Sequence, residues 1–227
     1  MALTDNLTYY WKLDENSGNA TDSIGSKTLT NNGTTTYATG KINNGAVFNG
    51  TSQWLSIADE AGLRYSSTQA FSISFWFKLD DTTGVQTIIS KWDNDATKDQ
   101  EYVIYMNGTT LEFVVNGDTA KTVKISSLSA DTWYHCVATA ATNKVLNLYI
   151  NAGTPATKTS TNGFLTNYSE FRVGQNTGTN YFDGIIDEIG FWNRVLTSDE
   201  VSELYNSGNG LQYPFTTTTF LPQMILT

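Results

Sequence analysis

Residues 182–194 read FDGIIDEIGFWNR and run directly into VLTSDE at residues 195–200. The first part alternates with the period of two that is typical of a β-strand. This period puts one set of side chains on each face: Ile186, Glu188, Gly190 and Trp192 on one, and Ile185, Asp187, Ile189 and Phe191 on the other. Because both faces carry large apolar residues, we expect a strand that is covered on both sides.

Two acidic residues inside this apolar run need partners if the strand is covered. Asp187 and Glu188 are adjacent, so the alternation places them on opposite faces of the strand. A carboxylate in a covered strand must be ion-paired, hydrogen-bonded or bound to a cation, because burying it alone is costly.

The second part of the stretch predicts one short helix. Thr197 followed three positions later by Glu200 is the capping-box pattern of a helix N-terminus. We expect this helix to end at Gly208 and to bury the apolar residues Val201, Leu204 and Tyr205.

The composition favours an all-β protein. Charged residues make up 15% of the 227 residues, below the roughly 25% of average globular chains, and Thr, Asn, Ser and Gly take their place. Aromatic residues reach 13%, and they favour strands together with β-branched residues. Asn-Gly pairs at 44–45, 107–108 and 116–117 mark turns. A single sandwich domain of this length is common.

Several blocks in a fixed order carry a family resemblance. The closing stretch resembles the closing motif of laminin-G-like domains of the concanavalin A-like lectin/glucanase superfamily. The blocks YYWKLDENSG (9–18), TDSIG (21–25), GAVFNG (45–50), FSISFWFK (71–78) and DTWYH (131–135) are similar to earlier strands and loops of that family. The resemblance implies a two-sheet antiparallel β-sandwich of the jelly-roll, concanavalin A-like type with one short C-terminal helix.

We expect the sandwich to occupy residues 1–210 and an extended tail to occupy residues 211–227. The tail follows the complete closing motif, carries no charge and ends in the apolar sequence FLPQMILT. An exposed apolar segment of this kind is an aggregation hazard. Two alternatives would cover it: folding back on its own sandwich, or docking to a protein assembly.

Charge and segment patterns exclude several partners. A net charge of −9 without a basic cluster argues against nucleic acid and anionic membrane surfaces. The apolar runs have the length of strands, and the N-terminus lacks the pattern of a signal peptide. Cys136 is the only cysteine, so no disulfide framework exists. Relatives are usually extracellular, and we expect an extracellular or virion-surface protein.

The chain is not expected to be an enzyme. Glucanases of the resembling superfamily carry Glu-x-Asp-x-x-Glu on one strand, so that their carboxylates share a cleft. Here Asp187 and Glu188 are adjacent, and Phe191 stands where a further acid would be needed. His135 is the only histidine and follows Trp133 in a strand pattern, so we interpret it as a core residue.

The resemblance implies a structural calcium ion. The family would combine the aspartate of an opening loop with that of the closing strand, here Asp22 and Asp187, and backbone carbonyls near Ser23 and Gly25 would complete the shell. The alternative is that Asp22 caps a turn and Asp187 accepts hydrogen bonds from backbone amides of that same loop.

The candidate ligand is a glycan or polysaccharide. Lectins stack sugar rings on Trp or Tyr and bond their hydroxyls through Asn, Asp and Gln, usually on loops. Two loops that share a rim in the resembling family supply such residues: Trp92, Asp93 and Asn94, and Gln175, Asn176 and Tyr181.

Two functions follow from these observations. The first is a non-catalytic carbohydrate-binding or adhesion module displayed on a surface assembly. The second is a structural or decoration protein of a virion without a specific glycan ligand.

Overall fold

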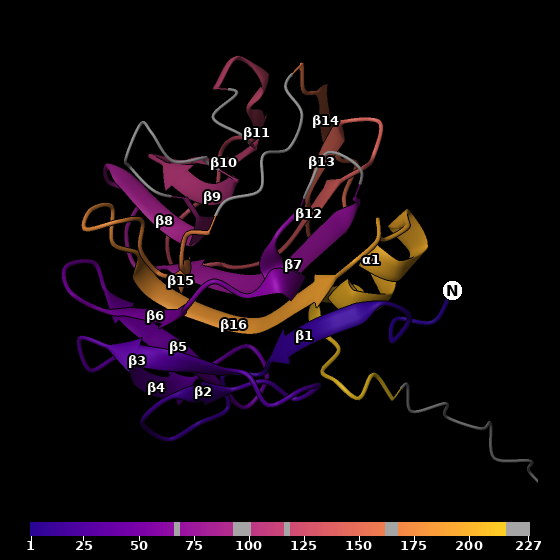
Figure 1. Ribbon diagram of the computed structural model, residues 1–227. Coiled ribbons are helices and arrows are strands. Elements are labelled where there is room, and N and C mark those ends of the chain that lie inside the picture. Colours follow the sequence, from indigo (N-terminus) through magenta and orange to yellow (C-terminus); the bar gives the residue numbers. More distant parts are fainter. Residues whose placement is uncertain (66–68, 93–100, 116–118, 162–167, 217–227) are drawn as a thin grey trace, which may run out of the picture.

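The computed structural model describes residues 1–65, 69–92, 101–115, 119–161 and 168–216. Within these ranges the chain forms two antiparallel sheets that lie face to face, with one α-helix at one side (Figure 1). The predicted β-sandwich with one short helix is confirmed.

The first sheet has eight strands. Its order is β14 (Ala156–Thr159), β13 (Val145–Ile150), β12 (Trp133–Ala140), β7 (Phe71–Leu79), β16 (Asp183–Trp192), β5 (Asn44–Asn49) and β4 (Thr36–Thr39), and β1 (Leu7–Trp11) also pairs with β16.

The second sheet has eight strands as well. Its order is β11 (Val123–Ile125), β10 (Thr110–Val115), β9 (Tyr102–Asn107), β8 (Val85–Lys91), β15 (Phe171–Val173), β6 (Trp54–Ile57), β3 (Thr28–Asn32) and β2 (Ala20–Thr21). Short 3₁₀ turns span Ala61–Leu63, Thr119–Lys121 and Asn206–Gly208, and the helix α1 spans Ser198–Tyr205.

The main core fills the space between the sheets because the strands alternate. In β7, Ile73, Phe75 and Phe77 are buried in that core, while Ser74 and Trp76 belong to the outer face. Fully burying an aliphatic or aromatic side chain of this size contributes roughly 1.5–3 kcal/mol. The closing strand β16 lies at the centre of the first sheet, hydrogen-bonded to β7, β5 and β1.

A β-bulge interrupts β16 at the acidic pair. The register with β7 shifts between Asp187 and Gly190, and Glu188 has a φ of 53°. Ile186 and Ile189 both belong to the main core, so the two residues between them face away from it. The expectation that Asp187 and Glu188 lie on opposite faces is therefore wrong, because a bulge inserts an extra residue and breaks the period of two.

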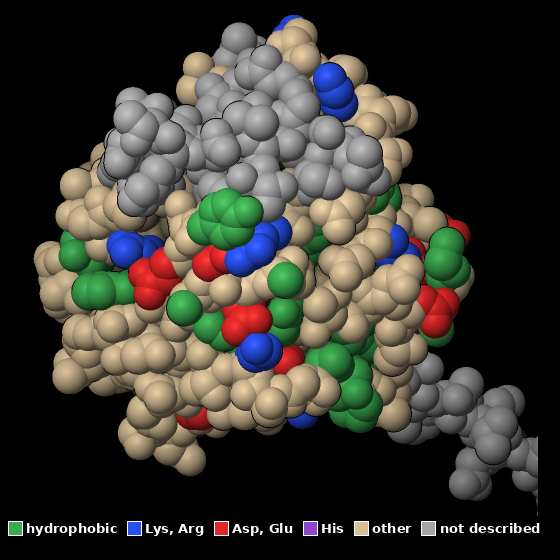
Figure 2. All heavy atoms as spheres, viewed as in Figure 1, with side chains coloured by type: hydrophobic (Ala, Val, Ile, Leu, Met, Phe, Trp, Pro, Cys, Tyr) green, Lys and Arg blue, Asp and Glu red, His purple; other side chains and the backbone are tan. Residues whose placement is uncertain are grey.

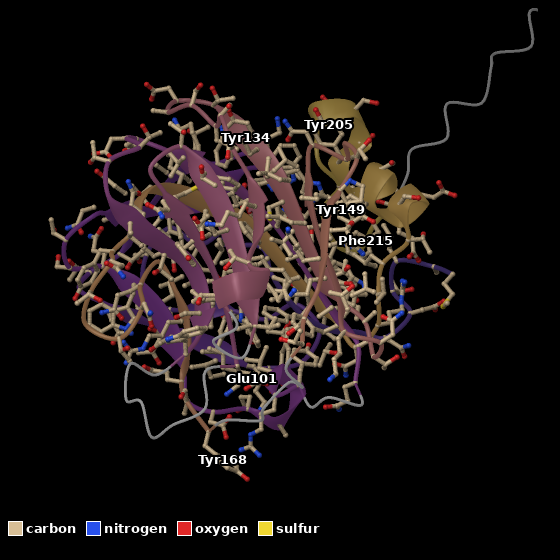
Figure 3. The ribbon with its side chains drawn as sticks, turned by 90° about the horizontal axis from the view of Figure 1, so that it is seen from above. Glu101, Tyr134, Tyr149, Tyr168, Tyr205 and Phe215 are labelled. Carbon is tan, nitrogen blue, oxygen red and sulfur yellow. The ribbon has the colours of Figure 1, made fainter. Side chains whose placement is uncertain are left out.

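The helix begins as its sequence indicates, but α1 ends at Tyr205 and not at the predicted Gly208, and Tyr205 is only partly buried. The Thr197 side chain accepts from the Glu200 backbone N–H, and the Glu200 side chain accepts from the Thr197 N–H, which confirms the capping box. Val201 and Leu204 are buried against the outer face of the first sheet. They form a second apolar cluster with Leu3, Val137, Tyr149, Trp192 and Leu196. Figure 3 shows Tyr149 and Tyr205 on this side of the sandwich.

Residues 211–215 extend this second cluster. Leu211 and Phe215 pack against it, and the Phe215 ring lies 5.3 Å from that of Tyr10 and 6.4 Å from that of Trp192. The packed body therefore continues past residue 210, and the start of this segment folds back on its own sandwich. Residues 217–227, and with them most of the predicted tail, lie outside the described residues.

Truncation after residue 210 should lower the melting temperature, since it removes the Phe215 ring from the second cluster. Phe215→Ala alone should cost about 1–2 kcal/mol, as the ring is partly buried. Thr216→Ala, at an exposed neighbouring position, is the control and should melt like the parent protein. Equal thermal unfolding of Phe215→Ala and Thr216→Ala would contradict this role of the segment.

Candidate functional site

The acidic pair of β16 is buried inside a hydrogen-bond network. Asp187 is 0% exposed, and its Oδ2 accepts from the backbone N–H groups of Lys41 at 2.8 Å and Ile42 at 3.0 Å. Glu188 is 3% exposed and accepts from the Tyr10 hydroxyl and from the Gln212 amide. A substrate cannot reach carboxylates buried to this extent, so the pair serves the fold.

Burial raises the pKa of both carboxyl groups to about 8. For Asp187 the neighbouring charge of Glu188 adds to the rise, while the two backbone N–H groups oppose it. For Glu188 the hydrogen bonds from Tyr10 and Gln212 oppose it. The closeness of the two groups follows from the bulge, which puts both on the same side of the strand.

The residues predicted to hold calcium accept hydrogen bonds from two separate loops. Asp22 is 4% exposed; its Oδ1 accepts from the N–H groups of Tyr10 at 2.8 Å and Ile24 at 3.0 Å, and its Oδ2 from that of Gly25 at 2.7 Å. Ser23 is exposed, and its N–H donates to the Tyr10 carbonyl. Asp187 instead accepts from the loop that contains Lys41.

These contacts do not fit a calcium ion shared by Asp22 and Asp187. Three of their four carboxylate oxygens face backbone N–H protons, and only Oδ1 of Asp187 is buried without a partner. Within the described ranges no group of three or more His, Cys, Asp or Glu is arranged to hold a metal. Calcium binding therefore stays a prediction from the resemblance, and no step of the proposed function depends on it.

His135 is 2% exposed on β12, and its Nε2 lies 2.9 Å from the Ser74 hydroxyl. Its Nδ1 is buried without a hydrogen-bond partner in the structure. Burial lowers the pKa of His135 to about 3, because a protonated ring would bury a charge that nothing around it pairs.

This lowered pKa predicts a loss of stability in acid. At this residue the unfolded chain takes up a proton near pH 6.5 whereas the folded one does so only near pH 3, so the contribution of His135 to stability falls as the pH drops below about 6.5. Between pH 7 and 5 the loss should reach about 2 kcal/mol. His135→Gln should remove this part of the pH dependence; parallel unfolding curves for the two proteins at pH 7 and 5 would contradict it.

A hollow of about 270 Å³ lies on the outer face of the second sheet. Tyr102, Ile104 and Met106 of β9 are buried in the main core, so the alternate residues of that strand face outward. We call this the first hollow, and it is lined by Val85, Thr87, Trp92, Val103, Tyr105, Asn107, Val114, Thr119, Asn176 and Asn180. The lining combines two aromatic rings and three amide side chains with an apolar floor, and none of the described residues that line it is charged.

Backbone hydrogen bonds hold the loop before β16 against β8. The Gly174 N–H donates to the Ile88 carbonyl at 2.8 Å, and the Thr87 N–H donates to the Asn180 carbonyl at 2.8 Å. The Phe182 N–H closes the loop on the Gly174 carbonyl at 2.9 Å. The backbone that carries Asn176 and Asn180 is therefore fixed against β8 before a ligand arrives.

The structure brings some of the predicted ligand residues together and separates others. Trp92 and Asn176 both line the first hollow, and Tyr181 lines a neighbouring one. Gln175 is 1% exposed and accepts from Arg172 at 2.5 Å, so it supports the sheet beneath the loop. Asp93 and Asn94 lie outside the described residues.

Sequence reasoning missed the residues that the strands contribute. Thr87, Tyr105 and Asn107 line the first hollow from β8 and β9. The sequence did contain a signal for them. Tyr105 and Asn107 alternate with the apolar Ile104 and Met106, and this pattern places a tyrosine and an asparagine on the outward face of the strand.

A second hollow of about 280 Å³ adjoins the first and shares Val85 and Asn180 with it. Its other lining residues are Gly50, Asp81, Thr83, Gly84, Gln86, Tyr181 and Asp183. The two hollows together form a path across the ends of β8 and β16.

A third hollow of about 620 Å³ is lined by residues 16–19, Asn31 and residues 34–37. Its polar groups are engaged by the fold: the Asn31 amide donates to the carbonyls of Gly18 and Thr35, and the Tyr37 hydroxyl donates to that of Gly18. In the first hollow the Tyr105 hydroxyl and the Asn107 amide likewise donate to the Glu112 carboxylate, but the first hollow is the stronger candidate because it also carries a tryptophan.

Solved structures of several binding domains are similar to this chain. The binding domain of Paraclostridial Mosquitocidal Protein 1 superposes with a TM-score of 0.71 at 20% identity, over 89% of this chain and 52% of that one. Domain 4 of AbnA, a GH43 extracellular arabinanase from Geobacillus stearothermophilus in complex with arabinotriose, gives 0.66 at 24% identity, over 87% and 97%. The Botulinum Neurotoxin serotype G binding domain gives 0.65 at 19% identity, over 82% and 48%.

The chain thus spans about half the length of the two toxin domains and nearly all of the arabinanase domain, and at these identities the likeness concerns the fold. No curated protein sequence matches the chain. Among the described residues, no helix has the length and apolar character that crossing a membrane requires.

A family model described as the concanavalin A-like lectin/glucanases superfamily, of the laminin-G type, matches residues 48–202. These residues include the central strand β7, the strands β8, β9 and β10 that line the first hollow, and the capping box of α1. By fold and by sequence, the chain belongs to the concanavalin A-like lectin/glucanases superfamily.

Proposed function

We propose that the protein is a non-catalytic carbohydrate-binding module that holds a glycan in the first hollow. The observation that carries this proposal is the joint placement of Trp92, Tyr105 and the amides of Asn107, Asn176 and Asn180 around one outward hollow. Aromatic rings pack against the C–H faces of sugars, and amides both donate to and accept from their hydroxyls.

The lining of the first hollow also supports binding without catalysis. Glycoside hydrolysis needs two carboxyl groups, one on either side of the bond, and the described residues of this lining include no carboxyl group. The carboxylates of Asp187 and Glu188 are buried on the other sheet. We therefore expect the protein to bind a sugar and to release it chemically unchanged.

The relatives agree with this class of function. The similar arabinanase domain is in complex with arabinotriose, and the similar toxin domains are binding domains. That arabinanase is extracellular, and we propose an extracellular setting for this chain too.

Neither the relatives nor the described residues favour decoration of a virion, or docking through residues 217–227, and both stay hypotheses from the sequence. Figure 2 shows apolar side chains only in small separate groups on the viewed face, with acidic and basic side chains as neighbours. The described residues of that face form no contiguous apolar patch of the kind that docks another protein.

Binding to an array of immobilised polysaccharides tests the proposal. The parent protein should bind a defined subset, and Trp92→Ala should weaken that binding at least about tenfold, since it removes an aromatic contact. The control is Tyr205→Ala, which removes an aromatic ring from the helix on the opposite sheet (Figure 3). No specific polysaccharide across a diverse array, or equal binding by Trp92→Ala, would contradict the proposed function.

A further inference from the structure

The second hollow lies beside the first and has two lining residues in common with it. Val85 and Asn180 line both, and Val85 is 40% exposed at the boundary. A ligand that fills the first hollow can therefore continue into the second. The lining of the second hollow differs in kind, because it contains two carboxylates, Asp81 and Asp183.

Only one of these carboxylates is engaged by the fold. The Asp81 Oδ1 accepts from the Thr83 N–H at 2.7 Å and from the Gln86 amide at 2.9 Å. The Asp183 carboxylate accepts no hydrogen bond from the part of the chain that the structure describes. It is half-buried in the lining of the hollow, so its acceptor positions are open to a ligand.

The backbone holds Asp183 firmly in place. It is the first residue of β16, its N–H donates to the Gln86 side-chain oxygen at 3.0 Å, and its carbonyl accepts from the Asp80 N–H at 3.1 Å. Gly50 lies so close that a Cβ there would be 3.0 Å from the Asp183 side chain. Partial burial, Asp80 and Asp81 together raise the pKa of Asp183, which shows that adding negative charge here is unfavourable.

We infer, on the basis of the proposed function, that the ligand is an uncharged oligosaccharide that occupies both hollows, and that Asp183 accepts hydrogen bonds from its hydroxyl groups. A carboxylate can accept from two neighbouring hydroxyls at once, and such charge-assisted bonds are about twice as strong as neutral ones. The same carboxylate repels a sugar that carries an acid group. The first hollow contacts sugar through rings and amides, so the second hollow supplies selectivity for charge and length.

Isothermal titration with cello-, xylo- and arabino-oligosaccharides of one to six units, and with oligogalacturonates as the acidic series, tests this inference. In the neutral series that binds, affinity should rise with length until both hollows are filled. Asp183→Asn should weaken binding of the long members at least about tenfold. Asp80→Asn is the matched control, since Asp80 lies nearby but does not line the hollow, and it should bind within about twofold of the parent protein.

The outcomes separate the two levels of the proposal. Binding of long neutral oligosaccharides that Trp92→Ala weakens but Asp183→Asn leaves unchanged would overturn this inference and keep the proposed function. Affinity that does not change with length, or tighter binding of oligogalacturonates, would do the same. No binding to the neutral or the acidic series by the parent protein would count against the proposed function itself and this inference with it.

Discussion

Replacing Asp187 by alanine is expected to lower the free energy of unfolding by about 2–4 kcal/mol. The carboxylate is 0% exposed and is the acceptor for two backbone N–H groups, those of Lys41 and Ile42, which join the loop after β4 to the centre of the first sheet. Alanine leaves both donors unsatisfied and removes the tie between loop and strand. Chemical denaturation at neutral pH measures the loss.

Asp187→Asn is the matched control. Its side-chain oxygen can still accept from both N–H groups, and it cannot ionise, which changes little at neutral pH because burial and the charge of Glu188 raise the pKa of the Asp187 carboxyl group to about 8. We expect Asp187→Asn to lie within about 1 kcal/mol of the parent protein. An alanine variant as stable as the asparagine variant would contradict this role. A melting temperature that falls in chelator for the parent protein only would show that a cation shares the carboxylate.

Arg194→Ala is expected to cost about 3–5 kcal/mol. The guanidinium is largely buried, lies 2.7 Å from the Glu200 carboxylate and donates to the carbonyls of Ala2 and Asp5. It therefore connects the N-terminal segment, the end of β16 and the start of α1. Burial alone would raise the pKa of Glu200, but hydrogen bonds from Arg194 and Thr197 outweigh it and lower that pKa. Removing Arg194 leaves a buried carboxylate without its counter-charge.

A second substitution separates the charge from the lost packing. Glu200→Gln keeps the capping box, because glutamine can accept from the Thr197 N–H, and it removes the unpaired charge. The double variant Arg194→Ala/Glu200→Gln should therefore recover at least about 1 kcal/mol relative to Arg194→Ala. A double variant no more stable than the single one would show that the cost lies in packing and not in the charge.

The fold could be predicted because its signals are local and repeated. The blocks at 71–78 and 131–135, which resemble parts of the family, coincide with β7 and the start of β12, and the pair Thr197 and Glu200 marked the start of α1. These patterns depend on backbone geometry and burial, which a single sequence expresses directly.

The bulge in β16 could not be predicted in the same way. Alternation carries no sign of an inserted residue, and Glu188 is not a residue that favours a positive φ. Its place is fixed by distant partners, Tyr10 and Gln212. The packing of Phe215 likewise depends on Tyr10 and Trp192, which are remote or unmarked in sequence.

Only part of the candidate site could be predicted, because its loop residues are easier to recognise in a sequence than its strand residues. Trp92 and Asn176 were visible as an aromatic and an amide on polar loops, and both line the first hollow. Tyr105 and Asn107 belong to strands, and their role depends on which face of β9 is outward and on which loop lies above it. Gln175 has a polar side chain in the predicted loop, but that side chain accepts a hydrogen bond from Arg172 within the sheet and does not line the hollow.

Mapping of backbone amide shifts by NMR tests the central claim most directly. The parent protein, labelled with ¹⁵N, is titrated with the oligosaccharide that binds most tightly in the calorimetric series. Our account predicts saturable shifts concentrated at the first hollow, at residues 85–87, 103–107 and 176–180, with the indole signal of Trp92 among the largest. Saturable shifts confined to the third hollow around Asn31 and Tyr37, or to α1, with residues 85–87 and 103–107 unchanged, would contradict it.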